Sequence, residues 1–213
     1  APDTHRYLFV WAGDAEKKSS DFLVVLDVTP EHPSYGRVVA SVAAGAVGTV
    51  PHHTEYTLSE SGFLFANGFD SGKSFEFDVR DPMRPKVVKA FDDLDGYMHP
   101  HSFVRLPNGH VLVSFHMKHG ERGGGLVELD DDARIVRSVS AVDPKAPDVL
   151  IRPYSIAVLP SLDRIVTTSS PMKFIEGFGT AVQVWRMSDL KLLNTVRLSP
   201  GPRGYGQEDP QEP

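Results

Sequence analysis

The sequence predicts an all-β fold, and within that class a β-propeller built from four-stranded antiparallel blades. Short runs alternate apolar and polar residues, turn-forming residues separate the runs, and helical periodicity is weak throughout. The pattern also repeats. Pro51, Pro100 and Pro153 each open a similar segment at intervals of about fifty residues, which is near the length of one propeller blade.

The repeats divide the chain into four predicted blades and the start of another. The first repeat contains only three strand-like runs, so its innermost strand is predicted to be missing, whereas each of the next three contains four runs. Residues 1–213 are therefore predicted to form a single propeller domain or its N-terminal part. The blade-like repeats cover about 1–47, 48–94, 95–146 and 147–200, with 201–213 opening a further blade.

The repeat at 95–146 shows the blade pattern clearly. The run "SFVRL" is followed by the turn "PNG" and the run "HVLVSFH", and after a glycine-rich loop come "LVELD", the turn "DDDA" and "RIVRSVS". The segment "GERGGG", Gly120 to Gly125, is predicted to be a flexible loop, with a lid over a site as the alternative. The best helix candidate, "MSDLKLLNTV", is predicted to be a turn between two strands.

Composition excludes several classes of function. The 213 residues are 40% hydrophobic and carry a formal net charge of −6, with no cluster of Lys and Arg, so nucleic acid is not an expected partner. No apolar run approaches the roughly 18 residues of a membrane span, so no membrane association is expected. The absence of cysteine excludes disulfides, thiolate metal sites and cysteine nucleophiles.

Histidines recur where the predicted blades begin. His52 and His53 open one inner strand, and His101, with His99 beside it, opens the next. The first strand of each blade lines the central channel of a propeller, so these side chains are expected at one end of that channel. Neutral imidazole is a preferred ligand of copper, zinc, iron and nickel. We therefore predict a metal site formed by His52, His53 and His101, with His99 as a further candidate.

Strand geometry refines this prediction. Adjacent residues of a regular strand point to opposite faces, so only one of His52 and His53 is expected to be a direct ligand. His116, at the end of a returning strand, and His119, in the loop after it, are expected near the same end of the channel. The sequence identifies no catalytic residue. Ordinary hydrogen-bonded or half-exposed roles are expected for His5, His32 and His110.

Four segments of the chain resemble one known family. They read "DFLVVLDVTPEHPSYGRVV", followed after a spacer by the paired histidines, then "FEFDVRDPMRPKVVKAF", "GERGGGLVELD" and "VQVWRMSDLKLLNTVRL". They are similar, in the same order, to segments of the selenium-binding protein / methanethiol oxidase family, which has motifs such as D-V-D-P-x-S-P-x-Y-G and L-H-H-S-G-W. The resemblance covers nearly the whole chain and corresponds to about the first half of the family's length.

The resemblance implies a seven-bladed propeller, of which this chain would supply about four blades. Bacterial enzymes of the family use copper to oxidise methanethiol to formaldehyde, hydrogen sulfide and hydrogen peroxide. By motif, the family's paired histidines fall on His52 and His53, and the histidine that opens its H-T-x-H stretch falls on His101. The remaining ligand is expected from a later blade outside this chain.

The chain departs from the family pattern at three points. The second histidine of H-T-x-H falls on Val104, and S-G-W is replaced by Thr54-Glu55-Tyr56. The absence of cysteine excludes selenium attachment through a thiol. The expected function is a copper-dependent oxidoreductase that oxidises a small thiol with O2. The alternatives are a non-catalytic metal-binding or protein-interaction propeller and, more remotely, a propeller oxygenase with iron held by four histidines.

Two further expectations concern partners and location. Open blade edges invite pairing with other strands, so a missing propeller segment or a second copy is expected to cover them. The chain begins "APDTHR" without Met, as a mature end left by signal cleavage would. A periplasmic or otherwise exported location is expected, with the cytoplasm as the alternative.

Overall fold

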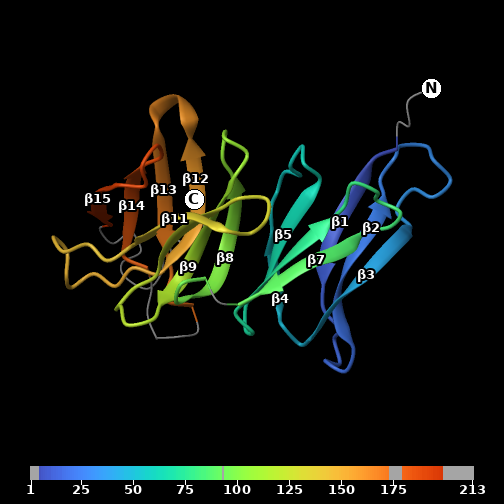
Figure 1. The fold of residues 1–213 in the computed structure, drawn as a ribbon, viewed down its shortest axis with the longest axis horizontal. Coiled ribbons are helices and arrows are strands. Elements are labelled where there is room, and N and C mark those ends of the chain that lie inside the picture. The colour runs from blue at the N-terminus through green and yellow to red at the C-terminus, as the bar shows by residue number, and fades with distance from the viewer. Residues whose placement is uncertain (1–4, 93, 173–178, 199–213) are drawn as a thin grey trace. The chain divides into compact units, whose positions relative to one another are not determined.

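All described strands pair antiparallel into four sheets, three with four strands and one with three (Figure 1). The computed structural model describes residues 5–92, 94–172 and 179–198. It divides the chain into two compact units, Ala1–Asp92 and Asp93–Pro213, each holding two sheets. The predicted all-β propeller architecture is confirmed. The predicted start of a further blade at 201–213 lies outside the described residues.

The first unit packs a three-stranded sheet against a four-stranded one. The first sheet has the order β1-β2-β3, and the second has the order β4-β5-β6-β7. Burial alternates along "SDFLVVLD", so Asp21, Leu23, Val25 and Asp27 form one fully buried face of β2. That face and the phenylalanines of β6 form a core, over which the ring of Trp11 packs. The strands are β1 (Tyr7–Ala12), β2 (Ser20–Asp27), β3 (Val38–Val47), β4 (Pro51–Thr54), β5 (Phe63–Gly68), β6 (Lys73–Asp78) and β7 (Lys86–Phe91).

The second unit contains two four-stranded sheets with the orders β11-β10-β9-β8 and β12-β13-β14-β15. Its core is aliphatic around the fully buried Trp185, whose indole N–H donates to Thr167 Oγ1 at 3.1 Å. The strands are β8 (Tyr97–Arg105), β9 (Val111–Lys118), β10 (Gly125–Leu129), β11 (Ile135–Ser140), β12 (Pro153–Leu159), β13 (Arg164–Ser169), β14 (Ala181–Arg186) and β15 (Leu192–Arg197).

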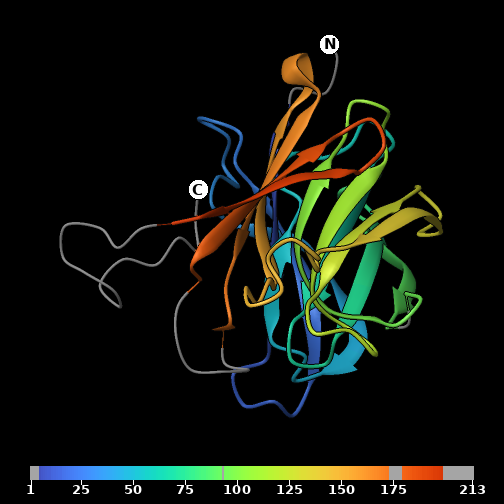
Figure 2. The same ribbon diagram turned by 90° about the vertical axis from the view of Figure 1, so that its left-hand side faces the viewer.

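The segment "MSDLKLLNTV" is not helical: "MSDLK" is the turn between two strands that the sequence predicts, whereas "LLNTV" belongs to the second strand. Strand β14 ends at Arg186, Leu190 adopts a left-handed φ of 54°, and β15 begins at Leu192. The 3-10 turn Pro160–Leu162 forms the tip of the β12–β13 hairpin, drawn in orange in Figure 2. None of the helical segments in the described ranges has the length and apolar character needed to cross a membrane.

The glycine-rich segment is packed rather than flexible at its C-terminal end. Gly124 N donates to Ile151 O at 3.1 Å and Gly124 O accepts from Ala141 N at 2.9 Å, while Gly125 is the first residue of β10. A Cβ on Gly124 would lie 1.8 Å from Phe115 O. The prediction of a flexible loop is therefore wrong for this end. Gly124 has no side chain, which allows its backbone to pack closely against the backbone of Phe115 and His116.

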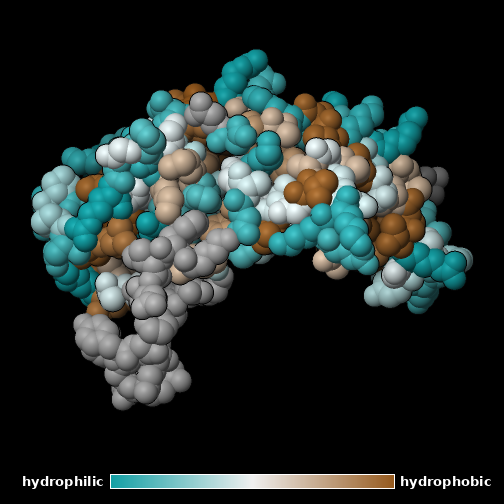
Figure 3. Space-filling model, turned by 90° about the horizontal axis from the view of Figure 1, so that it is seen from below, coloured by the Kyte–Doolittle hydropathy of each residue, from teal (hydrophilic) through white to brown (hydrophobic). Residues whose placement is uncertain are grey.

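The first sheet has an apolar face that faces away from its core. In the register of β1 and β2, Leu8 pairs with Leu26 and Val10 pairs with Val24, so the four side chains share one face. Leu8 is 50% exposed and Val10 is 36% exposed. Elsewhere, on the face shown in Figure 3, apolar atoms are interspersed with hydrophilic ones.

Candidate metal-binding histidines

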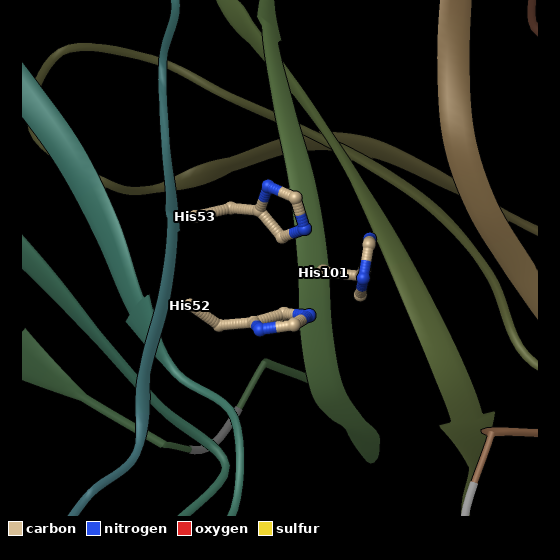
Figure 4. Close-up of side chains that lie close together, drawn as sticks. All are labelled: His52, His53 and His101. Atoms are coloured by element: carbon tan, nitrogen blue, oxygen red, sulfur yellow. The ribbon is translucent and has the colours of Figure 1, made fainter. Parts of the chain in front are cut away.

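A β-bulge turns His52 and His53 to the same side of β4. Pro51 pairs with Gly68 and Thr54 pairs with Ala66, so both histidines oppose the single residue Asn67. Asn67 Oδ1 accepts a hydrogen bond from His53 N at 2.6 Å, which fixes the extra residue. Figure 4 shows both side chains leaving the strand in one direction.

The two imidazoles therefore form a pair. Their ring centroids lie 4.4 Å apart with the planes at 81°. The expectation that His52 and His53 point to opposite faces is wrong, because the bulge breaks the alternation of a regular strand on which that expectation rested.

The surroundings of His53 favour its neutral imidazole. Burial and the neighbouring His52 lower the pKa of His53 to about 4. His53 is therefore uncharged near neutral pH, which is the protonation state that binds a metal ion. His52 is the exposed member of the pair, and its ring also lies 5.2 Å from that of Phe69.

A buried carboxylate fixes the start of β4 against the first sheet. Asp21 Oδ2 accepts hydrogen bonds from Thr49 N and Thr49 Oγ1, both at 2.6 Å, and both residues are almost fully buried. Glu55, which follows β4, is also buried and accepts from Phe65 N at 3.1 Å. The sequence reading did not single out Asp21, although a carboxylate in the buried register of an apolar strand is an unusual feature that could have drawn attention to it.

His101 is fully buried in β8 and held from two sides within its own unit. Its Nδ1 lies 3.0 Å from Ser102 Oγ. Its ring lies 3.6 Å, centroid to centroid, from that of Tyr154, with the planes inclined by 34°. Ser114 Oγ completes the arrangement by accepting from Ser102 N at 3.0 Å and donating to Tyr154 O at 2.6 Å. The imidazole therefore has a fixed orientation.

Two further aromatic residues define the surroundings of His101. His116 at the end of β9 returns to His101, as predicted, with the two ring centroids 5.2 Å apart. Tyr154 was missed by the sequence reading. The signal was present, because Tyr154 follows Pro153 just as His101 follows Pro100 at the start of its own blade.

The remaining candidates are less strongly placed. His99 is half-buried and has a left-handed φ of 57°, which interrupts the regular alternation of β8. His119 follows β9, and its N–H donates to Gly96 O at 2.8 Å. Val104 packs against the core of the second unit, so it fills an apolar position where the family has its second histidine.

The structure thus gathers the candidate ligands within each unit. His52 and His53 pair in the first unit, and His101 joins His116 and Tyr154 in the second. A single site that combines His52, His53 and His101 stays a prediction.

Comparison with known proteins places the chain among relatives of one kind. It is 28% identical to a methanethiol oxidase of Hyphomicrobium sp. over 92% of this chain and 49% of that protein. It is 32% identical to a methanethiol oxidase of Ruegeria pomeroyi over 61% of this chain and 31% of that protein. Selenium-binding protein 2 of Arabidopsis thaliana is 27% identical over 74% of this chain and 36% of that protein. The chain spans about half the length, or less, of these curated relatives.

Solved structures agree on the fold. A hypothetical selenium-binding protein from Sulfolobus tokodaii superimposes with a TM-score of 0.70 at 16% identity, over 93% of this chain and 50% of that chain. Dihydro-heme d1 dehydrogenase NirN superimposes with a TM-score of 0.60 at 14% identity, over 92% of this chain and 35% of that chain. The chain matches no family model. The sequence similarity to methanethiol oxidases and selenium-binding proteins, together with the shared propeller fold, supports the resemblance to the selenium-binding protein / methanethiol oxidase family.

Proposed function

We propose that this chain forms the copper-binding part of an oxidoreductase of the methanethiol oxidase type, which oxidises a small thiol with O2. The observation that carries the proposal is the His52–His53 pair, in which a bulge turns two adjacent imidazoles to one side of β4 and burial keeps His53 neutral. An all-imidazole donor set fits copper. The activity named for the relatives from Hyphomicrobium and Ruegeria supports the choice of reaction.

The proposed copper ligands are His52, His53 and His101, with His99 as a further candidate. His101 supports the proposal because it lies in the first strand of the next predicted blade along the chain and its ring is fixed by Ser102 and Tyr154. Copper held by these imidazoles would supply a centre for binding a thiolate and for accepting and passing on electrons. The chain's own contribution is to hold neutral rings in place, because ligands fixed by their neighbours lose little entropy on binding.

The proposed partner is a further propeller segment of the same protein, with a second copy of the chain as the other possibility. The apolar face of the first sheet, with Leu8 and Val10 exposed, supports this proposal because a neighbouring blade would bury it. Among the described residues, β1 also pairs on one side alone, with β2. Size-exclusion chromatography with light scattering tests the proposal. A stable monomer of 23.4 kDa counts against a partner for this chain.

Two observations favour the non-catalytic alternative. Val104 packs into the core where the family pattern has a histidine, so that ligand is lost. Glu55, at a position where the family has S-G-W, is buried and accepts a hydrogen bond from Phe65 N. A metal-binding propeller without activity would bind copper and consume no O2.

The test is O2 uptake by the copper-loaded full-length protein on addition of methanethiol. The proposed reaction consumes one methanethiol, one O2 and one water, and releases formaldehyde, hydrogen sulfide and hydrogen peroxide. Uptake should fall to background in His52→Ala/His53→Ala and persist in His110→Ala, a histidine paired with Glu128 outside the proposed site. Copper binding without O2 uptake would select the alternative.

A further inference from the structure

His5, Asp27 and His32 form a second cluster of metal-binding side chains in the first unit. Their donor atoms all lie within 4.8 Å of one another. His32 Nδ1 is 2.9 Å and His5 Nδ1 is 3.8 Å from the same atom, Asp27 Oδ2. Donor atoms around a tetrahedral ion with bonds of about 2.05 Å lie roughly 3.4 Å apart, and the two observed distances bracket that value.

The carboxylate of Asp27 is buried and oriented. Its side chain is 2% exposed, and Thr29 N donates to its Oδ1 at 2.8 Å. Ser34 Oγ donates to its Oδ2, the oxygen that faces the imidazoles, and hydrogen bonds from Ser34 and Thr29 hold the pKa of Asp27 far below its ordinary value. The group is therefore an ionised ligand whose supporting hydrogen bonds are already made.

The two histidines come from different segments that the backbone holds together. His5 precedes β1, and the neighbouring Arg6 O accepts from Val28 N at 2.8 Å. His32 lies in the turn between β2 and β3, where its Nδ1 is 2.7 Å from Ser34 Oγ. The two rings meet edge to face with centroids 4.5 Å apart. Their side chains are 32% and 38% exposed, so an ion from solvent can reach them.

A comparison within the chain separates this cluster from an ordinary histidine–carboxylate pair. Glu128 is equally buried and pairs with His110 at 2.7 Å, but Arg137 supplies it with a permanent cation at 2.5 Å. The ion-pair partners found for Asp27 in the described residues are the two histidines alone. Buried charges are generally paired with a cation or coordinate a metal ion. The environment of Asp27 is that of a buried carboxylate that coordinates a metal ion.

We propose that His5, Asp27 and His32 bind a divalent transition metal ion, with zinc as the preferred ion. Two imidazoles and one carboxylate are a donor set that zinc accepts, with water completing the coordination. The bound ion ties the segment before β1 to the β2–β3 turn, so it stabilises the first sheet.

This site is separate from the proposed copper site. Asp21, at the start of β2, contacts Thr49 next to the strand that carries His52 and His53. Asp27 is the last residue of β2, and six residues of extended strand span roughly 20 Å. The two sites therefore lie at opposite ends of one strand and can be tested independently.

The experiment measures zinc retained by the 213-residue chain after equilibrium dialysis, by elemental mass spectrometry. The background carries His52→Ala and His53→Ala, which removes two of the proposed copper ligands and keeps the two proposals apart. We expect one zinc ion per chain in this background. The zinc should be lost when His5→Gln and His32→Gln are added and retained when His110→Gln is added instead.

A second readout tests whether the variants fold and whether zinc stabilises them. Both variant histidines are partly exposed, and Ser34 and Thr29 keep their hydrogen bonds to Asp27, so circular dichroism should be unchanged without zinc. Added zinc should raise the unfolding temperature of the background and the His110→Gln variant, but not of the His5→Gln/His32→Gln variant. The proposal is overturned if the background retains no zinc, or if the His5→Gln/His32→Gln variant retains and responds to zinc as the background does.

Discussion

The ring of Tyr154 lies over the imidazole of His101, with centroids 3.6 Å apart and planes inclined by 34°. Each residue follows a proline in its blade's first strand, and Ser114 links the two strands by accepting from Ser102 N and donating to Tyr154 O. The position that carries a candidate ligand in one blade thus carries its aromatic support in the next.

Replacing Tyr154 tests this support. Tyr154→Phe keeps the ring and should leave copper affinity unchanged, whereas Tyr154→Leu removes the stacked ring and should weaken copper binding by roughly tenfold to a hundredfold, the usual effect of losing a residue that orients a ligand. Affinity is measured by competition with a chelator of known copper affinity. Equal affinities for both variants would show that Tyr154 does not orient His101.

Glu128 should make the stability of the second unit depend on pH. Although burial raises its pKa, hydrogen bonds from Asn108, His110 and Arg137 lower it below the ordinary 4.5. The depressed pKa contributes stability that is present above the unfolded value and is lost as pH falls through the folded value. Chemical denaturation should therefore show a loss of stability on going below about pH 4.5 that is smaller in Glu128→Gln.

The same substitution should be costly near neutral pH. Glu128→Gln leaves Arg137 without its buried anion and should lower the free energy of unfolding by about 3 kcal/mol. The matched control is Asp132→Asn, which breaks the exposed pair with Arg134 and should cost less than about 1 kcal/mol. Equal effects of the two substitutions would contradict the role given to Glu128.

Gly124 should tolerate no side chain. A Cβ there would lie 1.8 Å from Phe115 O and 2.7 Å from the carbonyl carbon of His116, so Gly124→Ala must push β9 away from β10 and should destabilise the chain by more than about 3 kcal/mol. Gly120→Ala is the control. Its Cβ meets no atom, and its φ of +77° should cost about 1 kcal/mol. Thermal unfolding distinguishes the two variants. If Gly124→Ala lowered the unfolding temperature no more than Gly120→Ala does, the loop would not be closely packed.

Thr49 should position the histidine pair through Asp21. Thr49→Val keeps the shape but removes one of the two hydrogen bonds to Asp21 Oδ2, which should cost about 1–3 kcal/mol. Since β4 begins two residues later, the side-chain NMR signals of His52 and His53 should shift as well. The exposed Thr57→Val serves as the control, and unchanged histidine signals in Thr49→Val would contradict a positioning role.

Much of the fold could be predicted from the sequence because strand alternation and turn residues are local signals. The strand β2, with its apolar run, and the turn between β14 and β15 follow directly from such signals. The direction of His52 and His53 could not be predicted, since it depends on a bulge made by pairing with Asn67, fourteen or fifteen residues away in the chain. The packing of Gly124 depends likewise on backbones that are distant in sequence.

The candidate sites divide in the same way. The repeat of proline and histidine at the predicted blade starts pointed to His52, His53 and His101 as candidate ligands. Tyr154 occupies the equivalent position after Pro153, but a tyrosine there did not suggest a role at the site. Ordinary hydrogen-bonded or half-exposed roles are predicted for His5 and His32, because no sequence signal joins them to Asp27 across the β2–β3 turn. Their convergence depends on the hairpin register and on the segment before β1.

The most direct test of the central claim is the copper content of the purified 213-residue chain after loading with copper and removal of free metal. We predict one copper ion per chain, with electron paramagnetic resonance showing nitrogen ligands. The copper should be lost in the His52→Ala/His53→Ala/His101→Ala variant and retained in His110→Ala. A chain that binds no copper, or a triple variant that binds it as the unaltered chain does, would contradict the claim that these histidines form a copper site.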